Sequence, residues 1–270
     1  MIFSYEQIPS HNNPVLPPET PLYRYLSVDK FKSLLERNEL LFAKISSWAD
    51  AQEGLRFNAM RVKEPDHHYS TRSLDSFYAS CWSLQTEDKL LFGSPEHYQE
   101  SVDELAKDGS DAMWRAYCQD RGVRIKTTLG KLEELFLASS LPTSALYSGR
   151  VYYDPFGSNW GNTLRHNHFM SVFLQKRVCF RSEAEFRFLF CATDDIPDTH
   201  INIPIPNLYN LVDEVLISPA RRENKACSQN LVGMTQAIFP RDLNACGNTK
   251  NGQQFCRISQ LYGNVEWPNW

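Results

Sequence analysis

The first regular pattern of apolar positions along the chain is helical. Apolar residues within residues 28–38 recur at the three- and four-residue spacing of one helix face: Val28, Phe31, Leu34 and Leu35. Ser27, just before them, is a preferred N-cap residue. Strand-like runs at residues 22–25 and 40–43 flank this pattern. The pattern therefore predicts a compact strand–helix–strand unit.

Strict alternation marks a strand farther along the chain. Residues 185–191 place one set of side chains on each face: Phe186, Phe188 and Phe190 on one, Glu185, Arg187 and Leu189 on the other. Further strand-like runs cover residues 77–83, 122–127, 151–154 and 215–217, and helical patterns cover 113–117, 129–136 and 163–176. Short strands separated by helices without a regular βαβ rhythm predict an α+β fold. We expect a bent, mostly antiparallel central sheet with flanking helices.

Breaks in these patterns predict the domain organisation. Prolines crowd residues 8–21, so residues 1–20 are predicted to form an extended arm. Polar stretches predict surface inserts near residues 60–76 and 94–110. The last part of the chain is rich in Gly, Asn and Gln. Residues 21–245 are thus predicted to form a single α+β domain, followed by a tail over 246–270.

Composition excludes several classes of protein. Hydrophobic residues make up 42% of the 270, which is enough for a real core and argues against global disorder. A formal net charge of −4 argues against a basic clamp on nucleic acid. No apolar run approaches the roughly 20 residues that span a bilayer, and the first residues lack a signal-peptide pattern. Seven cysteines without a C-x-x-C pair favour free thiols, so we expect a cytoplasmic protein without membrane contact.

Five short motifs occur in the order of a known family. They are Tyr23-Arg24-Tyr25, residues 42–53, Ser80-Cys81-Trp82-Ser83, residues 113–123 and Glu183-Ala184-Glu185-Phe186-Arg187. In this order they resemble DUF2971, a bacterial domain family of unknown function, over most of residues 20–220. That family usually carries Asn-Asp-Pro and a following Glu after its second strand. This chain keeps Asp50 and Glu53 there but lacks the Asn and the Pro.

A second resemblance implies an activity. The opening strand–helix–strand is similar to the start of ADP-ribosyltransferases, including DNA-modifying toxins. In that superfamily an Arg or His of the first strand holds NAD and a Glu of a late strand is catalytic, which Arg24 and Glu185 match by order. Glu183 matches the first Glu of the Glu-x-Glu pattern in the arginine-modifying branch, and Ser80 matches the middle position.

This resemblance implies a set of partners and site residues. NAD would be the substrate, no metal is expected, and the acceptor would be a protein, a nucleic acid or a small molecule. A role as a bacterial toxin or phage-defence effector, with a cognate antitoxin, is also implied. The candidate catalytic residues are Glu183 and Glu185, and the candidate NAD-binding residues are Arg24, Tyr25, Ser80, Trp82, Trp114 and Tyr117. Further site candidates are Asp50, Glu53 and Arg187.

The residue types suit that chemistry. A carboxylate beside the ribose stabilises the positive charge that develops as nicotinamide leaves. An arginine forks onto phosphate oxygens with a geometry that lysine cannot copy. Aromatic rings can stack on nicotinamide or adenine.

The charged candidates also have purely structural explanations. Glu185 and Arg187 share a strand face and could pair as a solvated ion couple. Arg24 could close a buried salt bridge with Asp50 or Glu53. A non-catalytic module that binds a nucleotide or a protein partner through the same cleft is therefore the alternative function.

The remaining candidates favour a structural explanation more strongly. Trp114 and Tyr117 lie three residues apart on a predicted helix, which favours core packing. Cys81 is predicted to be a buried structural thiol. His166 and His168 lack a third ligand at a set spacing, which argues against a metal site.

Overall fold

The computed structural model divides the chain into two compact units, and each is described here by itself. The described residues are 4–8, 15–50, 53, 57, 72–84, 95–119, 121–154, 169–219, 231, 233–234, 249–250, 253–259 and 261. Unit 1 comprises Met1–Thr20, Glu39–Ser83 and Leu129–Pro204, and unit 2 comprises Pro21–Asn38, Leu84–Thr128 and Ile205–Trp270. Both units draw on the predicted single domain of residues 21–245.

Unit 1 is built on a sheet with the strand order β10–β3–β4–β9–β6–β1. Its strands are β1 (Ser4–Gln7), β3 (Glu39–Lys44), β4 (Phe77–Ser83), β6 (Ala145–Arg150), β9 (Glu185–Cys191) and β10 (His200–Pro204). The pairing is antiparallel except between β1 and β6. With several helices beside a large mixed sheet, the chain is a mixed α and β protein, as the α+β prediction requires.

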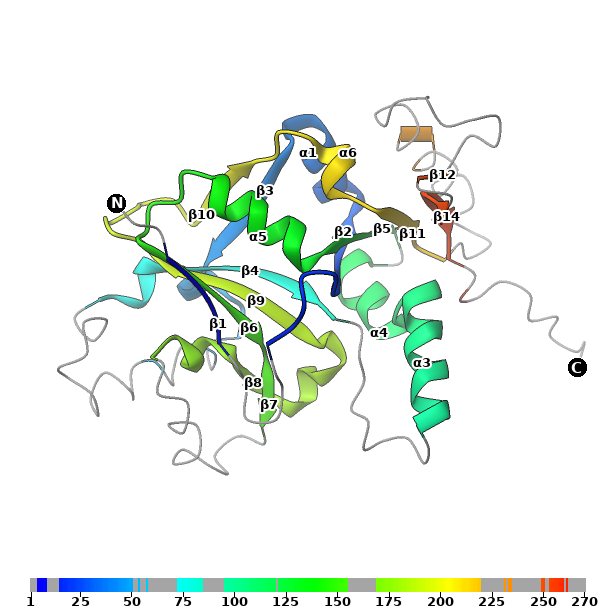
Figure 1. Ribbon diagram of the computed structural model, residues 1–270, viewed down its shortest axis with the longest axis horizontal. Helices are drawn as coiled ribbons and strands as arrows, with labels where there is room; N and C mark the ends of the chain where they lie inside the picture. The colour runs from blue at the N-terminus through cyan, green and yellow to red at the C-terminus, as the bar shows by residue number, and fades with distance from the viewer. Residues whose placement is uncertain are drawn as a thin grey trace, which may run out of the picture. The chain divides into compact units, whose positions relative to one another are not determined.

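Strand β9 is buried along its whole length on both faces. On one face Phe188 lies against Phe136 of helix α5 (Leu129–Ala138), with ring centroids 4.9 Å apart. On the other face Arg187 donates to the backbone carbonyl of Phe173 at 2.6 Å. Figure 1 shows α5 on one side of β9 and the β7–β8 pair on the other. The predicted alternation of faces is confirmed, but neither face is open to solvent.

The second face of this sheet is covered by a run of short elements. Residues Phe169–Leu174 form a 3-10 helix, η6, followed by β8 (Gln175–Arg177) and a 3-10 turn, η7 (Val178–Glu183). Strand β7 (Tyr152–Asp154) pairs in parallel with β8. The predicted helix over residues 163–176 is wrong over its described part. All six residues of η6 are buried, so this segment has no polar face for an amphipathic α-helix to present to water.

Unit 2 contains a sheet with the strand order β2–β5–β11–β14. Its strands are β2 (Pro21–Ser27), β5 (Gly122–Thr128), β11 (Glu214–Ile217) and β14 (Cys256–Ile258). Helix α1 (Val28–Arg37) begins after Ser27, whose hydroxyl accepts from the Lys30 amide, and ends at Asn38 in the left-handed conformation. The predicted helix and its cap are confirmed. Strand β3, expected to complete one compact unit with them, pairs with β4 and β10 in unit 1.

The polar stretch predicted as an insert near residues 94–110 is mostly a helix, α3 (Pro95–Asp108). Arg124, fully buried, donates to the carbonyls of Leu105 and Ala106 in the last turn of α3, at 2.8 and 2.6 Å. Ser259 donates its hydroxyl to the last carbonyl of α3, that of Asp108, at 2.8 Å. The last carbonyl groups of a helix lack partners within the helix itself, and these tertiary hydrogen bonds supply partners for three of them in α3.

The remaining regular elements are short. They are η1 (Ile45–Ser47), η2 (Leu74–Ser76), α4 (Asp111–Met113), the π-helical turn η4 (Trp114–Cys118), α6 (Leu208–Leu211), β12 (Thr249–Lys250) and β13 (Gln253–Gln254). The predicted arm and tail each contribute a strand to a sheet, β1 and β14. Residues 60–71 of the other predicted insert lie outside the described residues.

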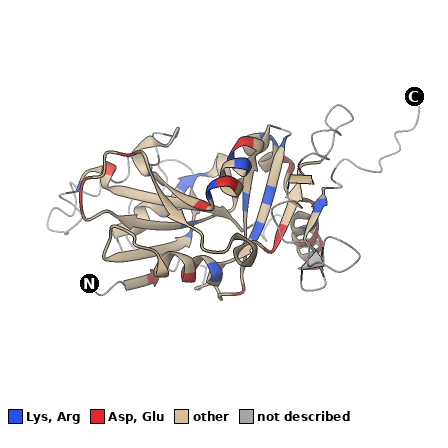
Figure 2. Ribbon diagram, turned by 90° about the horizontal axis from the view of Figure 1, so that it is seen from above, with Lys and Arg blue, Asp and Glu red and all other residues tan. Residues whose placement is uncertain are grey.

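Lys and Arg positions are interspersed with Asp and Glu positions (Figure 2). Among the helices of the described residues, none combines the length and the apolar character that a bilayer crossing requires.

Two neighbouring residues of α5 test the packing of unit 1. Phe136 is fully buried between Phe42 and Phe188, whereas Leu137 is 42% exposed. Phe136→Ala is expected to lower the free energy of unfolding by about 3–5 kcal/mol because it leaves a cavity. Leu137→Ala should change it by no more than about 0.5 kcal/mol. Urea unfolding measures both, and equal losses would contradict the described packing.

Candidate functional site

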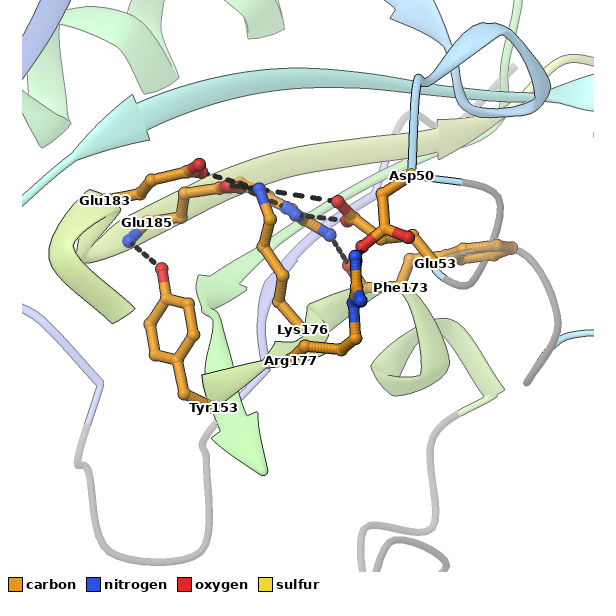
Figure 3. Close-up of polar contacts among 9 residues, drawn as sticks. Asp50, Glu53, Tyr153, Phe173, Lys176, Arg177, Glu183 and Glu185 are labelled. Carbon is orange, nitrogen blue, oxygen red and sulfur yellow. Dashed lines mark hydrogen bonds and ion pairs between the residues drawn. The ribbon is translucent and has the colours of Figure 1, made fainter. Parts of the chain in front are cut away.

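The two predicted catalytic carboxyls lie in unit 1, within a group of charged side chains on the face of β9 away from α5. This charge network consists of Glu53, Lys176, Glu183, Glu185 and Arg187 (Figure 3). The exposed fraction of these side chains ranges from 1% for Arg187 to 11% for Glu183. Because charges so far removed from water must be compensated locally, their contacts decide what the site can do.

The backbone brings Glu183 and Glu185 together through a left-handed residue. Glu183 ends η7, Glu185 begins β9, and Ala184 between them has φ +43°. An alanine rarely adopts this conformation, which costs roughly 1–2 kcal/mol. The turn leaves both carboxyls within hydrogen-bond distance of the ammonium group of Lys176.

Lys176 is shared by the three carboxyl groups. Its Nζ lies 2.6 Å from Oε2 of Glu183, 2.5 Å from Oε1 of Glu185 and 3.4 Å from Oε1 of Glu53. It comes from β8, where it pairs in register with Tyr153 of β7. The ammonium thus donates hydrogen bonds to Glu183 and Glu185 and forms a longer ion pair with Glu53.

Arg187 is the most deeply buried side chain of the network. Its Nε donates to Oε2 of Glu185 at 2.6 Å, and its Nη2 donates to Oε2 of Glu53 at 2.5 Å. Its Nη1 donates to the carbonyl of Phe173, and its guanidinium lies 4.5 Å from the centre of the Trp48 ring. The predicted pairing of Glu185 with Arg187 is present. It is buried, so the alternative of a solvated couple is wrong.

Three carboxyl groups against two cations leave one excess negative charge, and the two neighbouring glutamates respond in opposite ways. Burial, together with the adjacent Glu185, raises the pKa of Glu183 to about 8. Burial alone would also raise the pKa of Glu185, but Arg187, Glu183 and Lys176 hold it well below its usual range. At neutral pH Glu183 is therefore mostly protonated and Glu185 ionised, which makes the network neutral.

The neighbouring groups keep their ordinary protonation states. The glutamates raise the pKa of Lys176 despite its burial, so the ammonium stays charged. Burial and then the charge of Glu185 raise the pKa of Tyr153, whose hydroxyl accepts from the Glu185 amide at 2.8 Å. Desolvation raises the pKa of the Cys81 thiol to about 12, which argues against a reactive thiolate, but the residue is half-buried and not fully buried as the sequence predicts.

At the rim of the network, Asp50 pairs with Arg177. Nε of Arg177 donates to Oδ2 of Asp50 at 3.2 Å, and the Arg177 side chain is 37% exposed. Asp50 and Glu53, the residues kept from the family pattern after the second strand, thus both lie in this region. Glu53 contacts Lys176 and Arg187, and Asp50 contacts Arg177; their role in a functional site stays a prediction.

Sequence reasoning also missed two residues of the site, Lys176 and Tyr153. Lys176 lies in a segment that the sequence predicts to be a helix, and Tyr153 lies in one predicted to be a strand. A usable signal was the excess of carboxyl groups among the candidates, since three clustered glutamates require more than one cation.

The structure does not bring Ser80 and Trp82 to the charge network. Both lie on β4 and are 1% exposed, and the Trp82 indole donates to the Ser80 hydroxyl at 3.2 Å. The register pairs Ser80 with Phe188 and Trp82 with Phe186, so they occupy the phenylalanine face of the sheet. Glu185 occupies the other face, and a cleft shared by all three is therefore wrong.

The other four candidate NAD-binding residues belong to unit 2. Tyr25 and Trp114 are buried with rings edge to face at 4.8 Å, and the Trp114 indole donates to a backbone carbonyl of α3. Core packing therefore describes Trp114, whereas Tyr117 is 39% exposed. Arg24 and Tyr25 are adjacent in β2 and point to opposite faces. Their NAD-binding role stays a prediction.

Comparison with known proteins adds no relative. No family model, curated protein or solved structure matches the chain. The resemblances to DUF2971 and to ADP-ribosyltransferases therefore stay predictions. Within the described ranges, no group of three or more His, Cys, Asp or Glu side chains is arranged to hold a metal ion. His166 and His168 lie outside those ranges.

The proton on Glu183 predicts a pH dependence of stability. With a folded pKa raised to about 8, Glu183 contributes stability that is fully present below its unfolded pKa, near 4.3, and is lost as pH rises to about 8. Relative to Glu183→Gln, the free energy of unfolding of the wild type should fall by up to about 1.4 kcal/mol per pH unit in this window. Denaturant unfolding between pH 5 and 9 measures it, and parallel curves would show that Glu183 is ionised throughout.

The left-handed Ala184 predicts opposite effects for two substitutions. Ala184→Gly should raise the free energy of unfolding, because glycine adopts this φ without strain. The gain is limited to about 1 kcal/mol, because glycine also makes the unfolded chain more flexible. Ala184→Val should lower it by more than about 1 kcal/mol, since a β-branched side chain is strained there. Thermal unfolding distinguishes them, and a strongly destabilised glycine variant would show that Ala184 is not left-handed.

Proposed function

We propose that unit 1 carries an ADP-ribosyltransferase-like site that acts on NAD, with Glu183 and Glu185 as its catalytic carboxyls. One observation carries this proposal: two buried carboxyl groups, two residues apart in the sequence, share the Lys176 ammonium, and their pKa values are shifted in opposite directions. Cleavage and transfer at a glycosidic carbon use such a pair, one carboxyl exchanging a proton and the other keeping a negative charge. The Glu-x-Glu spacing of the resembled branch supports the same assignment.

The contacts divide the work between the two glutamates. Both oxygens of Glu185 accept hydrogen bonds from fixed cations, so Glu185 supplies a permanent, oriented charge. Glu183 has the largest exposed fraction of the network and binds its proton weakly enough to exchange it. NAD supplies the ribosyl group, with nicotinamide as the leaving group. Glu183, once ionised, accepts the proton that the acceptor oxygen or nitrogen loses as it bonds to the ribosyl carbon.

Unit 1 also offers groups suited to a dinucleotide. Arg177 is partly exposed on β8, and Arg181 is exposed on η7, the same turn that ends at Glu183. Arginines fork onto phosphate oxygens. Phe180, which lies between them in the sequence, is half-buried and offers a ring on which a base can stack. Arg24, Tyr25, Trp114 and Tyr117 belong to unit 2, and their NAD-binding role stays a separate prediction.

The biological setting is proposed from the resemblance alone. It comprises a cytoplasmic toxin or phage-defence effector, an acceptor that is a protein, a nucleic acid or a small molecule, and a cognate antitoxin.

A non-catalytic module that binds a nucleotide or a protein partner is the second candidate. Full engagement of the Glu185 oxygens and the Arg187 nitrogens favours it, because a self-satisfied ion network is also what a buried structural site requires. Such a module would bind its ligand without releasing nicotinamide from NAD.

Nicotinamide release from NAD, with and without cell lysate, tests the proposal. Glu183→Gln should lower kcat by about 10²–10⁴-fold, because it removes the proton acceptor, with a much smaller change in NAD affinity. Glu134→Gln, on the exposed surface of α5, is the matched control and should keep the wild-type rate. Glu185→Gln is a poorer test because it leaves two buried cations short of a partner, at about 3–5 kcal/mol of stability.

Two outcomes would contradict the proposal. NAD binding by the wild type without nicotinamide release would favour the non-catalytic module. Turnover by Glu183→Gln at the wild-type rate would show that Glu183 does not exchange the proton.

A further inference from the structure

Lys176 occupies a position that neither the resemblance nor the catalytic assignment uses. It reaches the charge network from β8, a three-residue strand. Its Nζ also lies 4.8 Å from the centre of the Phe180 ring. Its contacts with Glu183 and Glu185, at 2.6 and 2.5 Å, are the shortest that it makes in the network. One ammonium group therefore binds both members of the carboxyl pair.

The two cations of the network have different partners. Arg187 binds Glu185 and Glu53, and Lys176 binds these two and also Glu183. The charged and titratable groups around the pair come from five places in unit 1: Glu53, Cys81 on β4, Tyr153 on β7, Lys176 on β8, and Arg187 on β9. Lys176 is thus the cation of the network that contacts Glu183, whose carboxyl group is proposed to exchange a proton.

We propose that Lys176 is a positioning residue: its ammonium, shared by the carboxyl groups of Glu183 and Glu185, favours release of the Glu183 proton. Burial and the Glu185 charge favour the protonated form of Glu183, and the ammonium at 2.6 Å opposes them. Without that ammonium, Glu183 would keep its proton to a higher pH. This inference rests on the proposed function for its catalytic meaning.

The proposal makes a specific statement about pH. Lys176→Met keeps much of the side-chain length but removes the charge, so the pH at which Glu183 loses its proton should rise by at least about one unit, a tenfold change in proton affinity. If NAD is turned over, the alkaline rise of kcat should move by the same amount while KM changes little. Lys176→Arg keeps a cation and should restore most of the wild-type pH profile.

The experiment reads the titration from stability and therefore does not depend on activity. The free energy of unfolding is measured from pH 5 to 10 with and without Glu183→Gln, and the pH at which the difference levels off marks the titration of Glu183. The backgrounds are wild type, Lys176→Met and Lys176→Met with Glu53→Gln. The double variant removes one charge of each sign and so keeps the network neutral. It serves as the background if the single variant does not fold. Lys131→Met on α5 is the control for loss of a lysine elsewhere in unit 1.

An alkaline shift of at least one unit in whichever Lys176→Met background folds, with no shift in Lys131→Met, supports the proposal. An unchanged or lowered titration overturns it. Failure of both backgrounds to fold also overturns it, because Lys176 would then be needed for structure rather than for positioning a proton. Absence of nicotinamide release with the shift intact would instead reject the proposed function alone.

Discussion

The balance of charge among three buried carboxyls and two buried cations is the constraint on which the centre of unit 1 depends. Ionised groups so far from water must be compensated, and the charges of Lys176 and Arg187 can neutralise only two of the three glutamates. The excess charge disappears when Glu183 keeps its proton. The same contacts join β8 and β9 to Glu53, on a face of the sheet whose remaining contacts are mostly apolar.

Local patterns predicted the parts of the fold that local chemistry determines. The cap at Ser27 and the apolar face of α1 depend only on neighbouring residues, and both are as expected. The alternation along β9 was also right, because side-chain direction follows from the strand itself. What covers each face depends on distant segments. Local patterns therefore do not predict that η6 buries Arg187 or that residues 175–177 form a strand.

The candidate site was predictable in part for the same reason. Glu185 and Arg187 share a face because they are two residues apart, whereas Glu53 contacts Arg187 from 134 positions away in the sequence. Ser80 needed the register of β4 against β9 before its face could be assigned. Motif order alone could not show that Arg24 and Glu185 belong to different compact units.

Direct observation of the glutamate carboxyls tests the central claim most directly. Carbon-13 NMR of glutamate-labelled protein, titrated from pH 4 to 10, follows each carboxyl group separately. The charge network predicts one carboxyl that titrates at about pH 8, is lost in Glu183→Gln, and belongs to a protein that stays folded throughout. Titration of every glutamate below about pH 5, near the unperturbed value, would contradict the account because Glu183 would then be ionised at neutral pH.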